Sequence, residues 1–191
     1  MSRGLIALHY QNDVCHPDGA IPFAVDRSTT APQTFLETSR RTIEAARRHG
    51  WIVVHVHIAF APDYVDLPRN CRLFRAVETF GAVRAGSWGA APFAGFEPAV
   101  GDVVVVHRCN NAFQDTGLDA ILRDLGVDEL AVMGLATQYS VEHTVRHAVD
   151  LGYAVTLLKD CCGSADPEAA EASFRAMRML ADVVPSAELR L

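Results

Sequence analysis

No apolar run in the 191-residue sequence reaches the ~20 residues that a membrane-spanning helix requires. The first four residues, Met1 to Gly4, lead directly into a short apolar run and lack the organisation of a signal peptide. The net charge of −6 leaves no positive field that would attract nucleic acid or an anionic membrane. We therefore expect a soluble, cytoplasmic protein whose partner is a small-molecule substrate, with no nucleic acid or membrane partner.

The sequence also lacks a cysteine framework. Its five cysteines are odd in number, have no repeating spacing and include no Cys-x-x-Cys pair, which argues against structural disulfides and structural zinc. Free thiols that pack as small hydrophobic side chains are the expected state, including the adjacent Cys161 and Cys162. No motif calls for a cofactor.

Continuous apolar runs alternate with helical patterns through the whole chain. Such runs indicate strands that are buried on both faces, and they cover residues 5–10, 51–58, 103–106, 130–135 and 154–158, with a weak edge strand over 183–189. Helices are predicted over residues 32–49, 118–125, 139–151 and 167–180, with Thr30 and Asp166 as N-terminal caps. Repeated β-α-β units predict a mainly parallel sheet flanked by helices in a Rossmann-like, three-layer α/β domain over residues 1–191.

Polar residues gather where these strands end. His9, His57 and His107 lie at the carboxyl ends of three predicted strands, and the turn before Ser140 follows a fourth. Ligands of parallel sheets bind at this edge, so the pattern alone predicts a shared site there. Residues 59–101 hold four prolines and at most one short helix, at about 72–79, and we expect this long insertion to cover the pocket.

Three segments carry a resemblance to a known family: GLIALHYQNDVC (4–15), DVVVVHRCNNAF (102–113) and ELAVMGLATQYSVEHTVRHA (129–148). Together they resemble the isochorismatase-like superfamily, also called the cysteine hydrolases, whose motifs read roughly LLVIDxQNDF, VVxKxxxSAF and GVATxxCVxxTARDA. The resemblance implies a six-stranded sheet, assembly as a homodimer or homotetramer, and a hydrolase scaffold.

Laid over the family motifs, this chain departs from the catalytic triad. The family Asp falls on His9, the Lys on His107 and the nucleophilic Cys on Ser140. A thiol at a helix N-terminus ionises readily, whereas a serine hydroxyl needs an adjacent base, which a neutral His9 would provide. His107, with an ordinary pKa near 6.5, would supply the positive charge of the Lys only part of the time. Cysteine-dependent amidase chemistry is therefore not carried over, and Cys109 is a weaker alternative nucleophile.

The resemblance also implies a pocket. The peptide bond between the residues matching Leu135 and Ala136 is typically cis in the family and helps to form an oxyanion hole. The further candidates for the pocket wall are aromatic or imidazole side chains: Tyr139, Trp88, Phe113 and His57. His55 and His57 form a His-x-His pair, which is a weak metal signal.

Each candidate has a structural alternative. Ser140 could be a residue of the first helical turn whose hydroxyl bonds to the backbone. His9 could be a strand-end residue that bonds to the backbone and takes no part in chemistry. The aromatic residues could pack in the core. His55 and His57 would equally be bonded within the sheet.

Three functional hypotheses follow. The first is an enzyme of specialised metabolism in which His9, His107 and Ser140 hydrolyse a small carbonyl, amide or enol-ether compound. The second is an isomerase, cyclase or lyase that uses the two histidines to move protons. The third is a non-catalytic paralogue that binds a ligand or a partner.

Overall fold

The computed structural model describes residues 2–25 and 31–191. Within them, six strands form one sheet in the order β3-β2-β1-β4-β5-β6, and every neighbouring pair is parallel. The expected parallel sheet is thus confirmed and contains no antiparallel strand among the described residues. Its strands are β1 Ser2–Leu8, β2 Ile52–Ile58, β3 Val103–His107, β4 Val127–Leu135, β5 Ala154–Gly163 and β6 Asp182–Val184.

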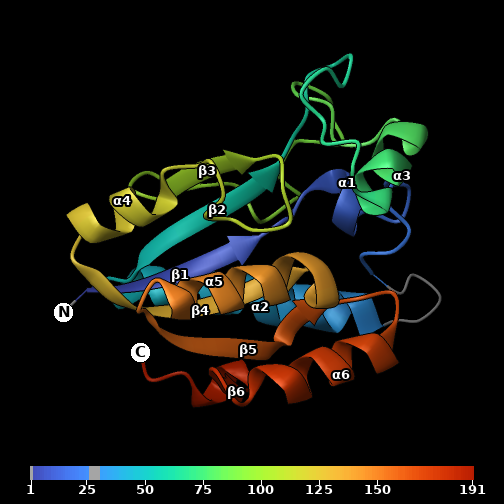
Figure 1. Cartoon of the computed structure of the whole chain (residues 1–191). Coiled ribbons are helices and arrows are strands. Elements are labelled where there is room, and N and C mark those ends of the chain that lie inside the picture. The colour runs from blue at the N-terminus through green and yellow to red at the C-terminus, as the bar shows by residue number, and fades with distance from the viewer. Residues whose placement is uncertain (1, 26–30) are drawn as a thin grey trace.

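Helices cover both faces of the sheet (Figure 1). One face packs against α2 Ala31–Arg48, and α3 Arg72–Phe80 joins the same core cluster beyond the carboxyl ends of the strands. The other face packs against α4 Leu118–Asp124, α5 Glu142–Asp150 and α6 Pro167–Met177. The remaining turns are α1 Asn12–Cys15, the π-helical η1 Thr137–Val141 and the 3-10 helix η2 Ser186–Glu188.

The continuous apolar runs are explained by this three-layer arrangement. In β1, Leu5 and Ala7 join the core beneath α2, while Ile6 and Leu8 join the core beneath α5. Because successive side chains point to opposite faces, a strand covered on both sides must be apolar at every position. Within the described residues, no helix combines the length and apolar character needed to cross a membrane.

Several element boundaries differ from the sequence expectation. β1 ends at Leu8, because His9 adopts a left-handed backbone conformation and a short helical turn follows. β5 continues through the two adjacent cysteines to Gly163, and all five cysteines are free thiols. The last strand is only three residues long, since Pro185 ends it and η2 follows. Asp166 caps α6 as expected, accepting from the Ala169 N–H at 2.9 Å, whereas Thr30 lies outside the described residues.

Residues 59–101 are attached to the carboxyl edge of the sheet by buried polar side chains. The Gln11 amide accepts from the Ile58 N–H (2.8 Å) and donates to the Ile58 carbonyl (2.9 Å) and to the Ala90 carbonyl (2.7 Å). Gln11 is fully buried, and a buried amide is stabilised only when it is bonded in this way. Gln11 therefore joins the end of β2 to the second half of the segment.

The next two side chains, Asn12 and Asp13, continue this attachment. Asn12 donates to the Trp88 carbonyl at 2.8 Å, and Asp13 accepts from the Val83 N–H at 2.7 Å. A Cβ at Gly89 would lie 1.9 Å from the Asp13 carboxylate, so only glycine fits this close approach. The Gln-Asn-Asp sequence thus places the long segment over the edge where the candidate site lies.

Candidate active site

His9 and His107 form a buried pair at the carboxyl edge. His9 follows β1 and His107 is the last residue of β3, and their rings meet across the end of β2 with an Nε2–Nε2 distance of 2.5 Å. The two residues are only 4% and 1% exposed. His9 has a φ of 61°, a region that residues with side chains rarely occupy, and its N–H donates to the Val56 carbonyl at 2.9 Å.

Backbone contacts define which nitrogen of His107 carries a proton. His107 Nδ1 lies 3.2 Å from the Asn111 carbonyl, which can only accept a hydrogen bond. Nδ1 therefore donates, and in neutral His107 the Nε2 atom is left with a lone pair. His9 Nε2 must then donate to it, so the neutral pair has a defined polarity from His9 to His107.

Burial keeps this pair uncharged at neutral pH. It lowers the pKa of His107 to about 4, although the Asn111 carbonyl acts in the opposite direction, and a positive charge on His57 is a smaller part of that lowering. Burial, and then a positive charge on His107, lowers the pKa of His9 well below 6.5, while the Leu135 carbonyl acts in the opposite direction. The part-time positive charge expected for His107 is therefore not present at pH 7, because desolvation outweighs its backbone contact.

Ser140 lies in η1, which follows β4 directly. It is 5% exposed, and in the described part of the chain no hydrogen bond joins its hydroxyl to His9 or His107. The peptide bond between Leu135 and Ala136 is cis, as the family resemblance implied. The Ala136 carbonyl accepts from the N–H groups of Tyr139 (3.1 Å) and Ser140 (3.0 Å).

These bonds leave other donors for an oxyanion. The first N–H groups of a helix have no partner within it. Among residues 2–25 and 31–191, no backbone acceptor is paired with the N–H groups of Thr137 and Gln138. The N–H of Ala136 is also without a backbone acceptor in these ranges. Of the three residues, only Ala136 lines the same small pocket as Ser140, so its N–H is the candidate donor for an oxyanion hole, in place of the N–H of Ser140.

His9 and Ser140 line one small pocket of about 30 Å³. That volume is well below the ~300–1,000 Å³ that sites for small molecules usually span. The pocket walls must therefore separate before a substrate enters. Its lining residues are His9, Val14, Ile21, Phe23, Ala24, Ile58, Leu73, Phe74, Val77, Asn110, Ala136, Tyr139 and Ser140.

The sequence analysis did not identify several of these lining residues. Asn110 follows β3, and the polar run Cys109-Asn110-Asn111 at a strand end could have indicated it. Leu73, Phe74 and Val77 come from α3, whose apolar spacing was visible but whose position against the sheet was not.

Other sequence candidates lie outside this pocket. Trp88 is 54% exposed and its ring contacts the edge of His16, with 5.1 Å between ring centroids. Phe113 packs against His147 and Tyr153 in the core on the other face of the sheet. Leu135 is fully buried and contributes its carbonyl near the His9 ring rather than a pocket wall.

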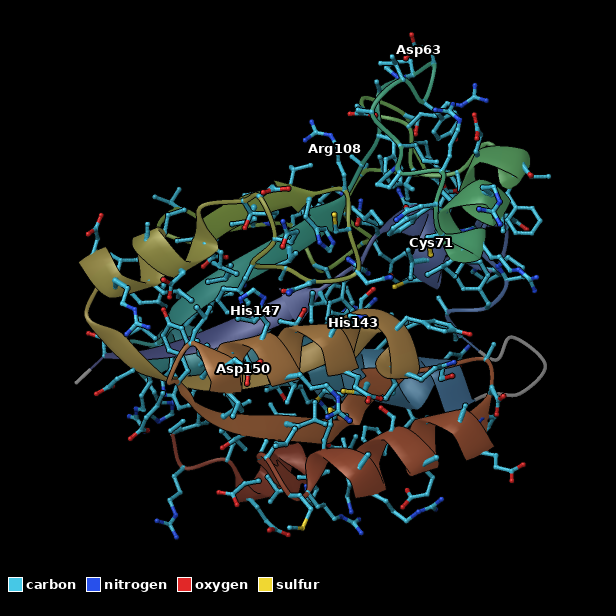
Figure 2. The ribbon with its side chains drawn as sticks, viewed as in Figure 1. Asp63, Cys71, Arg108, His143, His147 and Asp150 are labelled. Atoms are coloured by element: carbon cyan, nitrogen blue, oxygen red, sulfur yellow. The ribbon has the colours of Figure 1, made fainter. Side chains whose placement is uncertain are left out.

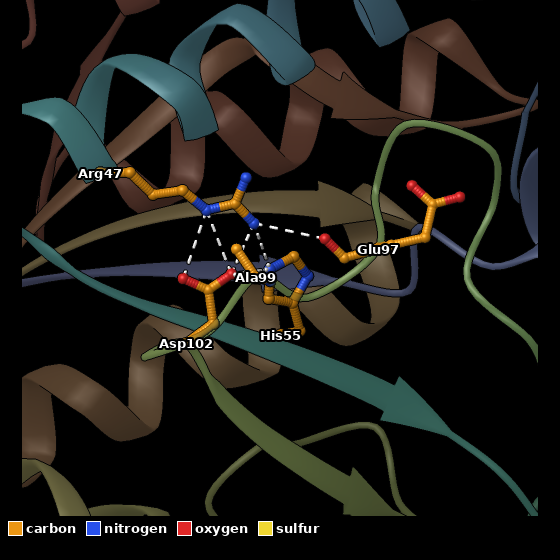
Figure 3. Close-up of polar contacts among 5 residues, drawn as sticks. All are labelled: Arg47, His55, Glu97, Ala99 and Asp102. Carbon is orange, nitrogen blue, oxygen red and sulfur yellow. Dashed lines mark hydrogen bonds and ion pairs between the residues drawn. The ribbon is translucent and has the colours of Figure 1, made fainter.

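His55 belongs to a separate polar network (Figure 3). Its Nε2 lies 3.0 Å from Asp102 Oδ2 and 3.2 Å from Arg47 Nη2, and Arg47 Nη2 lies 2.5 Å from the same carboxylate oxygen. The His57 ring lies beside it, at a centroid distance of 6.2 Å. Among the described residues, no group of three or more His, Cys, Asp or Glu side chains is placed to hold a metal ion.

The surroundings of Cys109 and of the neighbouring Arg108 exclude both side chains from the chemistry. Cys109 is half-buried, and burial followed by the nearby Asp115 raises the pKa of its thiol, which disfavours a thiolate. Arg108 does not reach the site, because it pairs with Asp66 at 2.5 Å on the surface.

Comparison with known proteins defines the class. The isochorismatase domain family matches residues 3–188, so the chain belongs to the isochorismatase family. Ureidoacrylate amidohydrolase RutB of Yersinia enterocolitica is 31% identical over 183 residues, which cover 89% of this chain and 79% of the relative.

Solved structures agree with this assignment. An isochorismatase family protein from Desulfovibrio vulgaris superposes with a TM-score of 0.85 and 31% identity, covering 97% of this chain and 95% of that one. N-carbamoylsarcosine amidase from Thermoplasma acidophilum gives a TM-score of 0.78 at 24% identity, with both chains covered completely. Nicotinamidase from Bacillus subtilis gives 0.83 at 23% identity, covering 96% of this chain and all of that one. At these last two identities the likeness shows the shared fold alone.

Proposed function

We propose that this protein hydrolyses a small amide or ureido compound, with Ser140 as the nucleophile and the His9–His107 pair as its base. In this proposal the pair replaces the family's Asp and Lys, and Ser140 replaces the family's Cys. The observation that carries it is that His9 lines the same pocket as Ser140 while its ring is bonded to His107. The substrate class follows from the ureidoacrylate amidohydrolase relative.

The walls favour an uncharged substrate. Apart from the imidazole of His9, the described lining contains no Asp, Glu, Lys, Arg or Cys side chain. Most of the lining is aliphatic or aromatic. Asn110 and Tyr139 are the polar groups that can orient an amide. A substrate carboxylate would meet no cationic side chain among these residues.

The first chemical step uses the defined polarity of the pair. Neutral His9 takes the Ser140 proton, directly or through a bridging water, and the Ser140 oxygen attacks the substrate carbonyl. The carbonyl oxygen becomes an oxyanion that accepts from the N–H of Ala136, which lines the pocket. The proton then remains on the pair, where the Leu135 carbonyl favours the charged form of His9.

The second step returns that proton. As the tetrahedral intermediate collapses, the C–N bond breaks, the departing amine takes the proton from the pair, and an acyl ester remains on Ser140. A water molecule, deprotonated by the again neutral pair, attacks this ester and releases the acid and free Ser140. The cycle consumes one water and needs no other reactant.

A second candidate is a proton-transfer enzyme, such as an isomerase or lyase. The observation in its favour is that no hydrogen bond joins the Ser140 hydroxyl to either imidazole within the described residues. A screen of small amides, ureido compounds, esters and enol ethers distinguishes the two, because the hydrolase forms a covalent adduct on Ser140 and releases an amine or alcohol. A binding protein would be stabilised by a compound without converting it.

A further inference from the structure

Asn111 holds the loop after β3 in three directions. Its carbonyl accepts from His107 Nδ1 at 3.2 Å, its Oδ1 accepts from the Phe113 N–H at 2.9 Å, and its side-chain amide nitrogen contacts His147 Nδ1. The Phe113 bond determines the orientation of the amide group, since a backbone N–H needs an oxygen acceptor. The Asn111 Nδ2 group must therefore donate to His147 Nδ1, which has to be unprotonated.

A second bond fastens the same loop to the same helix. The Ala112 N–H donates to Thr144 Oγ1 at 3.1 Å, and Thr144 lies one turn before His147 on α5. Helix α5 continues directly from η1, which carries Ser140. The helix that positions the proposed nucleophile thus also positions the carbonyl that bonds to His107.

The sequence differs from the family motifs at both of these positions. Laid over the motifs quoted above, Asn111 falls on the Ser of SAF and His147 falls on the Asp of TARDA. In the family motifs and in this chain alike, the first position carries a hydrogen-bond donor and the second an acceptor. The acceptor in the motif is the Asp carboxylate, whereas in this chain it is the His147 imidazole. A negative charge near His107 would raise its pKa, so an uncharged acceptor is consistent with a neutral histidine pair.

We propose that Asn111 and His147 are positioning residues that hold the Asn111 carbonyl against His107, so that His107 keeps its proton on Nδ1 and presents the Nε2 lone pair to His9. Only the expected effect on turnover rests on the proposed function. The effect on the tautomer of His107 does not.

Nuclear magnetic resonance of the intact protein labelled with ¹⁵N-histidine tests the tautomer directly. In the wild type at pH 7, His107 should give the signals of an Nδ1–H, Nε2-unprotonated imidazole. His147→Phe keeps the ring packed against Phe113, at the site of a 5.6 Å contact, but removes the acceptor, and His107 should then show a mixture of both tautomers. His143→Phe is the matched control, because His143 lies one turn earlier on α5 (Figure 2), and within the described residues its ring bonds only to the Tyr139 carbonyl of the preceding η1.

His147→Asp separates position from charge. It keeps an acceptor for Asn111 and should restore the single Nδ1–H tautomer of His107, while its negative charge raises the apparent pKa of the pair toward neutrality. In turnover, His147→Phe should lower kcat roughly tenfold or more with KM little changed, because the base is displaced. His147→Asp should recover most of that loss near neutral pH, with the acid limb of the rate profile moved to higher pH.

The proposal is overturned if folded His147→Phe keeps the wild-type tautomer of His107, or if His147→Asp gives the same tautomer mixture as His147→Phe. If the tautomer responds as expected but no compound is turned over by the wild type, the positioning role stands and the proposed hydrolase fails. If the tautomer is unchanged while turnover falls, the positioning role fails and the hydrolase proposal stands.

Discussion

Two buried histidines on neighbouring strands, His55 of β2 and His107 of β3, are held in opposite ways. His55 bonds to Asp102, which also binds Arg47, so its partners are charged and fixed. Burial raises the pKa of Asp102, but the Arg47 and Ala99 N–H bonds outweigh it, and the pKa lies below its ordinary value. Within the part of the chain that the structure describes, His107 has only a carbonyl and another imidazole as hydrogen-bond partners.

The difference indicates which histidine is free to move a proton. The carboxylate at His55 favours a protonated ring and offsets part of the desolvation, as expected of a structural ion network. The pKa of His55 nevertheless lies below 6.5. At the His9–His107 pair, no carboxylate among the described residues bonds to either ring, so only backbone carbonyls oppose the desolvation and the rings stay neutral beside a pocket. His9 is thus a neutral, buried base that lines the same pocket as the Ser140 hydroxyl, and nucleophilic catalysis by serine requires such a base.

The largest expected effect is on turnover at His9. His9→Asn removes the base but keeps a side chain that can bond to His107, so kcat should fall by about 10²–10⁴, the usual contribution of a positioned base. Asp102→Asn, in the other network, should lower kcat far less. The measurement is kcat for both variants on whichever substrate the screen identifies. Equal losses in the two variants would remove the distinction between the networks.

The next effect is on acid stability. The folded pKa of His107 is about 4, below the unfolded value of 6.5, so above pH 6.5 this group adds no pH dependence. As the pH falls from 6.5 to 4, the unfolded chain binds a proton that the native state does not, and stability falls. Between pH 7.5 and pH 5 we expect a loss of about 2 kcal/mol from this group.

Urea unfolding of the wild type and His107→Gln at both pH values checks this loss. The variant should show a smaller decrease between pH 7.5 and pH 5, whatever its stability at pH 7.5. His143→Gln, at an exposed position, should keep the wild-type decrease. An identical decrease in His107→Gln and the wild type would mean that His107 is not the titrating group.

A smaller effect on stability is expected at Asp102. Asp102→Asn removes the charge that binds Arg47 and His55 and should destabilise the fold by about 1.5 kcal/mol, the lower end for charge-assisted bonds, because Arg47 is partly exposed. The free energy of unfolding at pH 7 measures it. Unchanged stability in this variant would show that the network is not structural.

The smallest effect is expected at His57, which lies beside His55 and faces the pair only electrostatically. Burial lowers its pKa to about 4, so at pH 7 it carries no charge. His57→Asn should change kcat by about twofold or less, since a neutral ring outside the pocket contributes under ~0.5 kcal/mol. A tenfold loss would place His57 in the site after all.

The sequence alone predicted the parallel sheet and the proximity of His9 and His107, because continuous apolar runs and the ends of strands are local sequence patterns. The sequence could not place Trp88 and Phe113, because an aromatic residue in a loop has the same local sequence pattern whether it lines a pocket or packs in the core. It also could not give the charge state of the pair. Desolvation depends on tertiary packing, so an ordinary pKa near 6.5 was the natural expectation for His107, and the fold lowers it to about 4.

Acylation of the protein by the activated ester p-nitrophenyl acetate tests the central claim most directly, because it does not require the natural substrate. The account predicts a burst of about one p-nitrophenol per chain and an acetyl group on Ser140 in peptide mass spectra. The burst should vanish in Ser140→Ala, slow by roughly 10² in His9→Asn, and persist in Asp102→Asn and after thiol alkylation with iodoacetamide. An undiminished burst in Ser140→Ala, with acetyl found on another residue, would contradict it.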